Sequence, residues 1–272
     1  MKKPKLYDAG KPINRFQQFG NVMRYHIVEV MLSSLYTFIF GIPMIGWIFL
    51  TMYVPMFNQN NATAILVVNG VLAVLFGVFG LGFAGGMYFF KKLCFGEGAS
   101  LKEDYFGGIK RNGWLFFGIF FAQGLWYLAL HMMMGISAGM DIDPNLKMVM
   151  IGVGYGLYFL IAFVHLFMMS EAVMFEGGFF SLFYSSLRLS YANLYKGILI
   201  YLIVLLPLLL YEFLPFQLFN MIGLLVGAFI YFGLSQLCLT LYCNSVYDRS
   251  IFKTQFPEMH RKGLASEQEE QR

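Results

Sequence analysis

Charged residues are scarce in this chain of 272 residues, because Asp, Glu, Lys and Arg together make up only 12% of it. Hydrophobic residues make up 58%, which is more apolar surface than one soluble core can hide. This composition excludes an ordinary water-soluble globular protein. The net charge of +4 comes from basic residues scattered over several segments, which argues against a nucleic-acid partner and for contact with anionic lipid headgroups.

Cysteine and histidine are also sparse, with three and four residues. An odd number of cysteines argues against a structural disulfide, and the isolated histidines form no set at metal-ligand spacing. The sequence contains no His-Glu-x-x-His, Gly-x-Ser-x-Gly or phosphate-binding glycine motif. We therefore expect no enzyme activity, no metal and no cofactor.

Long uncharged apolar runs are what the chain does contain. Runs of about twenty residues match the length at which a helix crosses the hydrocarbon core of a bilayer. The runs are continuous and do not alternate with period two, so they predict helices rather than a membrane barrel. We expect an all-α, polytopic membrane helical bundle with about six spans. The expected spans are Val28–Tyr53, Ala62–Phe90, Trp114–Met134, Met148–Met169, Ile198–Glu212 running on toward Phe219, and Met221–Cys243.

Two of these spans contain helix-breaking residues. Proline lacks a backbone donor, so Pro43 predicts a kinked or partly re-entrant first span. The fifth span is interrupted by Pro207 and Pro215 and carries Glu212 near its end.

The distribution of basic residues predicts the orientation. With six spans, Lys147 stands on one side, and all the other Lys and Arg residues stand on the opposite side. The positive-inside rule then places both termini in the cytoplasm. We expect a cytoplasmic N-terminal amphipathic segment (1–27), a transmembrane domain (28–247) and a cytoplasmic C-terminal tail (248–272), of which residues 266–272 need not fold.

Three cytoplasmic segments have the pattern of amphipathic surface helices. In the first loop, Ser100 and Glu103 fit a capping box, and Asn112-Gly113 is expected to end a short helix. The second loop, residues 175–197, repeats this layout with more aromatic residues. The third is the N-terminal segment, where Pro12 fits a first helical position. These segments offer either interfacial helices or contact with a cytoplasmic partner. The candidate contact residues are Glu97, Phe106, Lys110, Asn112, Glu171, Gly177, Arg188 and Asn193.

Polar side chains inside the expected spans form a second candidate set. An unpaired polar group in hydrocarbon costs free energy, so each should face the bundle interior and serve either to join helices or to line a path. The residues are Asn69, Gln123, His165 and Gln236. Glycines spaced four residues apart, such as Gly152 and Gly156, indicate close helix packing within the bundle or in a homo-oligomer.

Several stretches resemble the YesL-like family of bacterial multi-pass membrane proteins. They are "GIPMIG" in the first span, "FGGIKRN" at Phe106–Asn112 and "SLRLSYANL" in the second loop. The sequence departs from the family where Met44 follows the early proline, a position at which the family often has threonine. The resemblance implies a bacterial inner-membrane protein associated with carbohydrate uptake, and it implies no catalytic residues.

The second loop also resembles the coupling loop of permeases driven by a cytoplasmic ATPase. Glu171, Gly177 and Leu189 fall at the spacing of that loop, although Ser190 stands where the loop has proline.

Three hypotheses follow from the sequence. The first is a transport-associated component that contacts a cytoplasmic partner. The second is a permease subunit with a coupling loop at 171–190. The third is a membrane sensor or assembly factor that does not transport.

Overall fold

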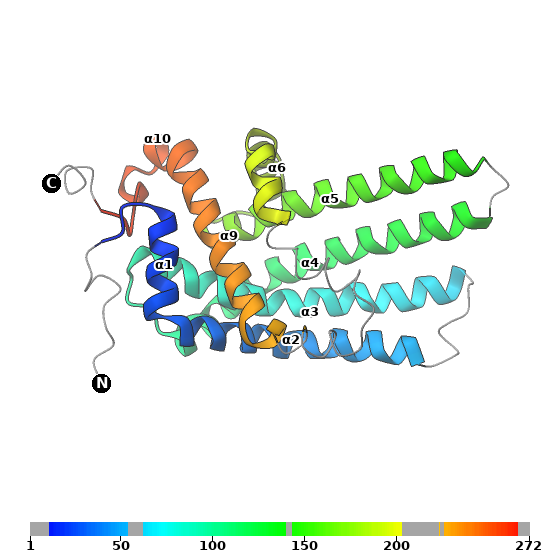
Figure 1. The fold of residues 1–272 in the computed structure, drawn as a ribbon, viewed down its shortest axis with the longest axis horizontal. Coiled ribbons are helices and arrows are strands. Elements are labelled where there is room, and N and C mark those ends of the chain that lie inside the picture. Colours follow the sequence, from blue (N-terminus) through cyan, green and yellow to red (C-terminus); the bar gives the residue numbers. More distant parts are fainter. Residues whose placement is uncertain (1–10, 54–61, 140–142, 203–222, 224–225, 266–272) are drawn as a thin grey trace. The chain divides into compact units, whose positions relative to one another are not determined.

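The computed structural model describes residues 11–53, 62–139, 143–202, 223 and 226–265 (Figure 1). Within these ranges the regular structure is helical and contains no strand. The bounds of the α-helices are α1 (Arg15–Tyr25), α2 (Ile27–Tyr53), α3 (Ala62–Phe95), α4 (Leu101–Gly139), α5 (Pro144–Met174), α6 (Phe179–Ala192), α9 (Phe232–Tyr247) and α10 (Lys253–Gln255).

Five helical segments of the described chain are long and apolar enough to cross a membrane. They are Ile27–Thr51, Thr63–Phe95, Leu101–Ser137, Pro144–Met174 and Gly227–Gln255. The last of these joins α9 to a π-helical turn at each end, η2 (Gly227–Tyr231) and η3 (Asp248–Phe252). The expected all-α membrane bundle is therefore confirmed. Most of the expected span Ile198–Glu212, with its continuation toward Phe219, lies outside the described residues, as do residues 266–272 of the C-terminal tail.

Helices continue through two positions at which the sequence suggested an interruption. Helix α2 continues through Pro43, so the first span is not re-entrant. Helix α4 continues through Asn112 and Gly113, which corrects the prediction of a short surface helix ending there. Both residues are buried in the helix, and burial of neighbouring side chains outweighs the roughly 1 kcal/mol that a helical glycine costs relative to alanine.

The helix starts are set by particular side chains. Asn14 caps α1 by accepting a hydrogen bond from the Gln17 amide, so α1 begins at Arg15 and Pro12 is not its first residue as expected. Asp143 caps α5, with Pro144 in the first turn. At the start of α4 the Ser100 amide donates to Asp104 at 2.6 Å. Asp104 therefore makes the bond expected of Glu103.

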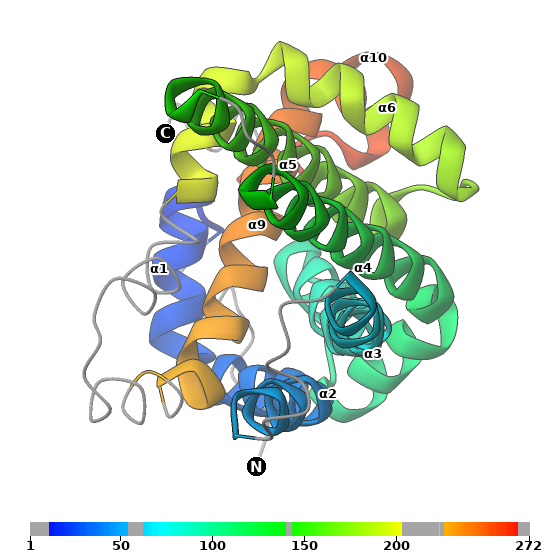
Figure 2. The ribbon, with the colours of Figure 1, turned by 90° about the vertical axis from the view of Figure 1, so that its right-hand side faces the viewer.

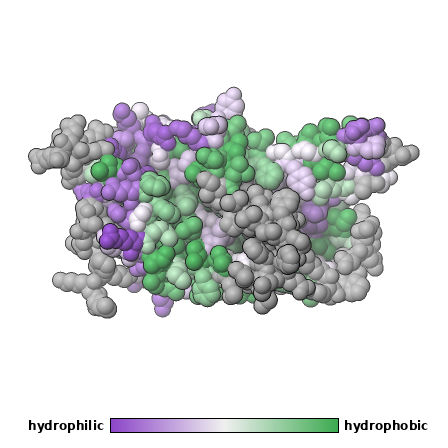
Figure 3. All heavy atoms as spheres, in the orientation of Figure 1, coloured by the Kyte–Doolittle hydropathy of each residue, from purple (hydrophilic) through white to green (hydrophobic). Residues whose placement is uncertain are grey.

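The chain divides into two compact units. Unit 1 comprises Met1–Phe38, Ala84–Arg111 and Asn193–Arg272, and unit 2 comprises Ile39–Phe83 and Asn112–Ala192. In unit 1, α1 packs on α9, and Gly233 permits close approach to the Val30 carbonyl (Figure 2). Hydrophilic residues of this unit gather over α1 and α10, whereas the first turns of α9 present apolar ones (Figure 3).

Unit 2 is held together by aromatic and small side chains. Phe76, Phe79 and Phe83 of α3 surround Phe120 of α4 at ring separations of 5.1 to 5.9 Å. Gly124 lies against Ala73, where a Cβ atom would come within 2.6 Å of the Ala73 Cα. Close packing of small residues replaces the hydrophobic driving force that water supplies in soluble proteins.

Candidate functional site

Gln123 and His165 form a buried pair inside unit 2. Gln123 comes from α4 and His165 from α5, and the two side chains are 8% and 4% exposed. The Gln123 Oε1 and the His165 Nδ1 lie 2.7 Å apart. Because an amide oxygen only accepts hydrogen bonds, this geometry assigns the proton to Nδ1 of the imidazole. Two residues predicted separately from the sequence are thus brought together.

A cavity of about 180 Å³ adjoins Gln123. Its lining combines apolar residues with three residues that carry a hydrogen-bonding group, Gln123, Tyr127 and Tyr158. The remaining lining residues are Met44, Ile48, Leu72, Phe76 and Gly124.

This wall has the composition of a binding site for a small molecule. Such sites are mostly apolar, with a few polar groups that fix the orientation of the ligand. The amide and the two phenols can donate and accept hydrogen bonds, and tyrosine rings offer flat apolar faces. The cavity is smaller than the roughly 300 to 1,000 Å³ of typical ligand pockets, so it fits a small solute better than an oligosaccharide.

Gln236 belongs to a different polar cluster, which lies in unit 1. Its Nε2 donates to the Thr37 hydroxyl at 2.9 Å, and its Oε1 accepts from the Ser33 hydroxyl at 3.2 Å. The Thr37 hydroxyl is also 3.1 Å from the hydroxyl of Tyr105. Both ends of the buried amide are therefore satisfied, and the cluster joins α9, α2 and α4.

The Gln236 cluster holds helices together and does not have the features of a binding site. Gly86 of α3 lies so close to the Gln236 side chain that a Cβ atom at residue 86 would collide with it. Gln236 and Thr37 are fully buried, and neither lines the cavity beside Gln123. This arrangement fits the expectation that intramembrane amides join helices.

Asn69 contributes to neither cluster. Its Nδ2 donates to the Ile65 carbonyl one turn earlier in α3, at 3.0 Å. A side chain that satisfies its own helix in this way needs no partner from another span.

The expected partner-contact residues divide between the two units. In unit 1, Phe106 and Lys110 are exposed, while Glu97 is exposed and paired with Lys262 at 2.6 Å. Asn193 follows the end of α6 and is half-buried. Phe106 and Lys110 are therefore the most accessible of these residues to a partner, whereas Glu97 is already paired and Asn193 is partly covered.

In unit 2, the expected contact residues are buried at two positions and exposed at two. Asn112 and Glu171 are 9% and 1% exposed, so neither side chain offers a surface to a partner. Gly177 and Arg188 are exposed. The Glu171 carboxylate accepts a hydrogen bond from the Ser185 hydroxyl at 3.0 Å, which ties the end of α5 to α6.

Helix α6 has an unusual distribution of side chains. Its buried stripe contains Leu182, Ser186 and Ser190, whereas Phe180, Tyr184 and Tyr191 are 75%, 65% and 84% exposed. Outward-facing aromatic rings are typical of helices in the headgroup region of a bilayer. The sequence predicted an amphipathic helix in this loop, and the structure shows that the aromatic face is the outer one.

Sequence reasoning missed the two tyrosines of the cavity and the residues that surround Gln236. Tyr127 follows Gln123 by four residues, so the two share one face of α4, and this spacing was a usable signal. Tyr158, Ser33 and Thr37 carried no comparable signal, because hydroxyl groups are common in spans and only the packing shows which of them meet.

No group of His, Cys, Asp and Glu residues in the described ranges could hold a metal ion. Comparison with known proteins gives no relative: no family model, no curated protein and no solved structure matches the chain. The class is set by the fold itself. The chain is a multi-pass, all-α membrane protein in contact with the lipid bilayer.

Proposed function

We propose that this protein is a transport-associated component of a bacterial cytoplasmic membrane, linked to carbohydrate uptake. The observation that supports the proposal is the cavity beside the Gln123 and His165 pair, which is lined by one glutamine and two tyrosines among apolar residues. Solutes rich in hydroxyl groups pair with amides and phenols, and their apolar faces stack on aromatic rings. The resemblance to YesL-like proteins supports the same substrate class.

The size of the cavity narrows the solute. A volume of about 180 Å³ fits a small polyol or a single sugar ring. A longer saccharide would require the four helices that line the cavity to separate. The proposed ligand is therefore a monosaccharide-sized molecule, held by Gln123, Tyr127 and Tyr158.

Uptake by cells tests this function. A strain that lacks the gene would be complemented with the wild-type protein, with Gln123→Leu or with Asn69→Leu, and supplied with a panel of labelled monosaccharides and polyols. Gln123→Leu removes the amide that lines the cavity, and we expect at least a tenfold loss of uptake of the preferred solute. Asn69→Leu removes an amide bonded within its own helix and should leave uptake near the wild-type level.

Two results would contradict the proposal. One is equal uptake by the deletion strain and the wild type for every solute in the panel. The other is wild-type uptake by Gln123→Leu cells that contain normal amounts of the protein, because the cavity would then have no role. Either result would favour a sensor or assembly factor without transport.

A second candidate function is a permease subunit coupled to a cytoplasmic ATPase through residues 171–190. The observation that favours it is the separation of α6 from α5 by a turn in which Gly177 is exposed, with Arg188 exposed on α6. Burial of Glu171 confines any coupling surface to the later part of this segment. Co-purification with a candidate ATPase tests the idea. We expect Gly177→Arg to reduce recovery of the ATPase, and equal recovery with a normally folded variant would exclude coupling.

A further inference from the structure

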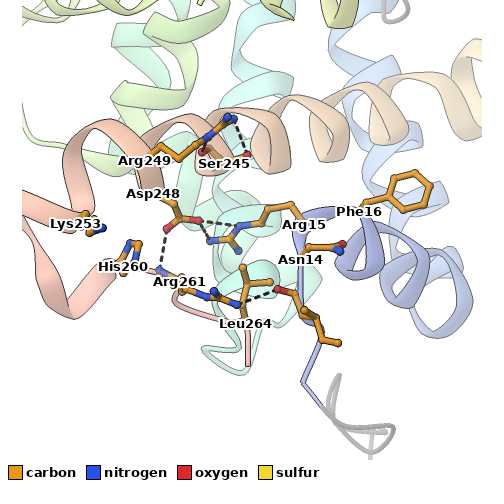
Figure 4. A pocket seen from close by; sticks show the side chains of 11 residues that line it. Asn14, Arg15, Phe16, Ser245, Asp248, Arg249, Lys253, His260, Arg261 and Leu264 are labelled. Carbon is orange, nitrogen blue, oxygen red and sulfur yellow. Dashed lines mark hydrogen bonds and ion pairs between the residues drawn. The ribbon is translucent and has the colours of Figure 1, made fainter. Parts of the chain in front are cut away.

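A second and larger cavity, of about 630 Å³, lies in unit 1 between the start of α1, the end of α9 and the C-terminal tail (Figure 4). Its volume is in the range of sites that hold small-molecule ligands. Four cationic side chains line it, those of Arg15, Arg249, Lys253 and Arg261. Asp248 is the only acidic residue among the lining residues.

The negative charge of Asp248 is already committed. Its Oδ2 accepts hydrogen bonds from Nη2 and Nε of Arg15 at 2.7 and 3.2 Å, and its Oδ1 accepts one from the backbone amide of Arg261 at 2.9 Å. Arg15 and Asp248 therefore neutralise each other. The charges of Arg249 and Lys253 remain without an acidic counterpart among the lining residues.

The backbone around these cations has unusual local conformations. Arg249 lies in the π-helical turn η3, and Lys253 directly follows that turn. Turns of this kind occur often at functional sites in helices. Arg261 adopts a φ of 53°, in the left-handed region that residues other than glycine rarely occupy. Its Nη2 donates to the Ile13 carbonyl at 3.2 Å, which fixes the guanidinium beside the cavity.

Two nitrogen atoms of residues that line this cavity, Nη1 of Arg249 and Nδ1 of His260, are not used in the hydrogen bonds of the described residues. Arg249 uses Nε and Nη2 to bind the Ser245 carbonyl and hydroxyl of its own helix, which leaves Nη1 for a ligand (Figure 4). His260 stands beside Lys253 and Asp248, and its Nδ1 is a buried polar atom without a hydrogen-bond partner in the described part of the chain. Guanidinium and ammonium groups around a free imidazole nitrogen form a binding site for an oxyanion.

An apolar rim accompanies the cationic wall. Phe16 is 85% exposed and Ile13 is 43% exposed, and both line the cavity. The cavity also lies at the end of the candidate span Gly227–Gln255, on the side where basic residues gather. A ligand that fits both walls carries a negative headgroup on an apolar body.

We infer that this cavity binds a phosphate-bearing anion, with the headgroup of an anionic phospholipid as the source that the apolar rim favours. Arg249 and Lys253 would hold the phosphate oxygens, and Ile13 and Phe16 would contact the glycerol and the first methylene groups. This site is separate from the Gln123 cavity, so the inference stands or falls independently of the proposed transport function.

Binding of soluble probes to the full-length protein in uncharged detergent tests the inference. The probes are dioctanoyl phosphatidylglycerol, dioctanoyl phosphatidylcholine and inorganic phosphate, titrated by calorimetry. The pocket variant is Arg249→Gln with Lys253→Gln, both on exposed side chains. The control is Lys102→Gln with Lys196→Gln, which removes two exposed cations that do not line the cavity.

The wild type should bind phosphatidylglycerol saturably and more tightly than phosphatidylcholine. Loss of two juxtamembrane cations should weaken phosphatidylglycerol binding roughly 30-fold in the pocket variant and by less than about twofold in the control. Inorganic phosphate should compete with phosphatidylglycerol and should also bind the pocket variant more weakly, which would support an anion site. If inorganic phosphate binds as tightly as phosphatidylglycerol, the natural ligand of this site is a soluble phosphate compound and not a lipid.

Three outcomes would overturn the inference. Equal weakening in the pocket variant and the control would show general attraction to a basic surface. Equal affinity for both lipids, unaffected by the pocket variant, would show binding through the acyl chains alone. Absence of saturable binding for every probe would show that the cavity holds no anion.

Discussion

Arg15 and Asp248 stand 233 residues apart in the sequence, and Nη2 of Arg15 lies 2.7 Å from Oδ2 of Asp248. Both side chains are almost fully buried, at 9% and 10% exposure. The bond joins α1, next to the N-terminus, to the turn that follows α9. Gln18 strengthens this junction by donating to the Cys94 carbonyl at the end of α3, at 2.6 Å.

Removal of one partner of this pair should be strongly destabilising. Asp248→Ala leaves the buried Arg15 charge without its partner, and we expect a loss of about 3 to 5 kcal/mol in the free energy of unfolding. The matched control is Glu97→Ala, which breaks the half-exposed pair with Lys262 and should cost about 1 kcal/mol or less. Unfolding in detergent, followed by circular dichroism, measures both. Similar losses in the two variants would contradict a buried role for Arg15.

Replacement of glycine by alanine should change the stability of the protein in opposite directions at Gly86 and at Gly20. Gly86→Ala places a methyl group against the buried Gln236 amide, and the resulting overpacking should cost about 1 to 3 kcal/mol. Gly20→Ala lies in α1 with no atom near its new methyl group, and it should stabilise the protein by about 0.5 to 1 kcal/mol. Thermal unfolding of both variants checks the signs. A neutral Gly86→Ala would mean that Gln236 moves aside freely.

The helical class and five spans could be predicted because the bilayer imposes a length and a polarity that composition alone reveals. Helix ends were harder to predict. Asn112 and Gly113 are frequent at helix ends, and in α4 they are buried in a continuous helix instead. Local preferences of about 1 kcal/mol are overruled where a helix packs on its neighbours over many residues.

The candidate site was predicted in part. Gln123 and His165 were both selected because a polar group in a span needs a partner, but their 2.7 Å contact depends on the rotation of α4 against α5. Asn69 was selected by the same rule and bonds its own helix. The Arg15 and Asp248 pair could not be predicted, because both residues lie near the ends of the chain, where charge is ordinary.

The link between Glu171 and Ser185 predicts how firmly α6 is held. Glu171→Ala removes the acceptor at the corner between α5 and α6, and we expect faster hydrogen exchange throughout residues 179–192. Glu171→Gln keeps an oxygen that can accept the Ser185 hydrogen bond and should exchange nearly as the wild type does. Hydrogen exchange followed by mass spectrometry distinguishes them. Unchanged exchange in Glu171→Ala would show that the buried stripe of Leu182, Ser186 and Ser190 holds α6 without this bond.

The orientation inferred from the basic residues predicts which side of the membrane each end of α4 and α5 faces. We replace the three cysteines by alanine and then introduce Lys102→Cys or Asn145→Cys, both at exposed positions. In spheroplasts, a membrane-impermeant maleimide should label Asn145→Cys and should label Lys102→Cys only after lysis. The reason is that Lys102 stands in the first turn of α4 and Asn145 follows the end of this helix, and the six-span arrangement expected from the sequence puts nearly every cation on the side of Lys102. Labelling of both positions in intact spheroplasts would place them on one side of the membrane and contradict α4 as a span. Labelling of Lys102→Cys alone would invert the orientation and put the anion site outside the cytoplasm.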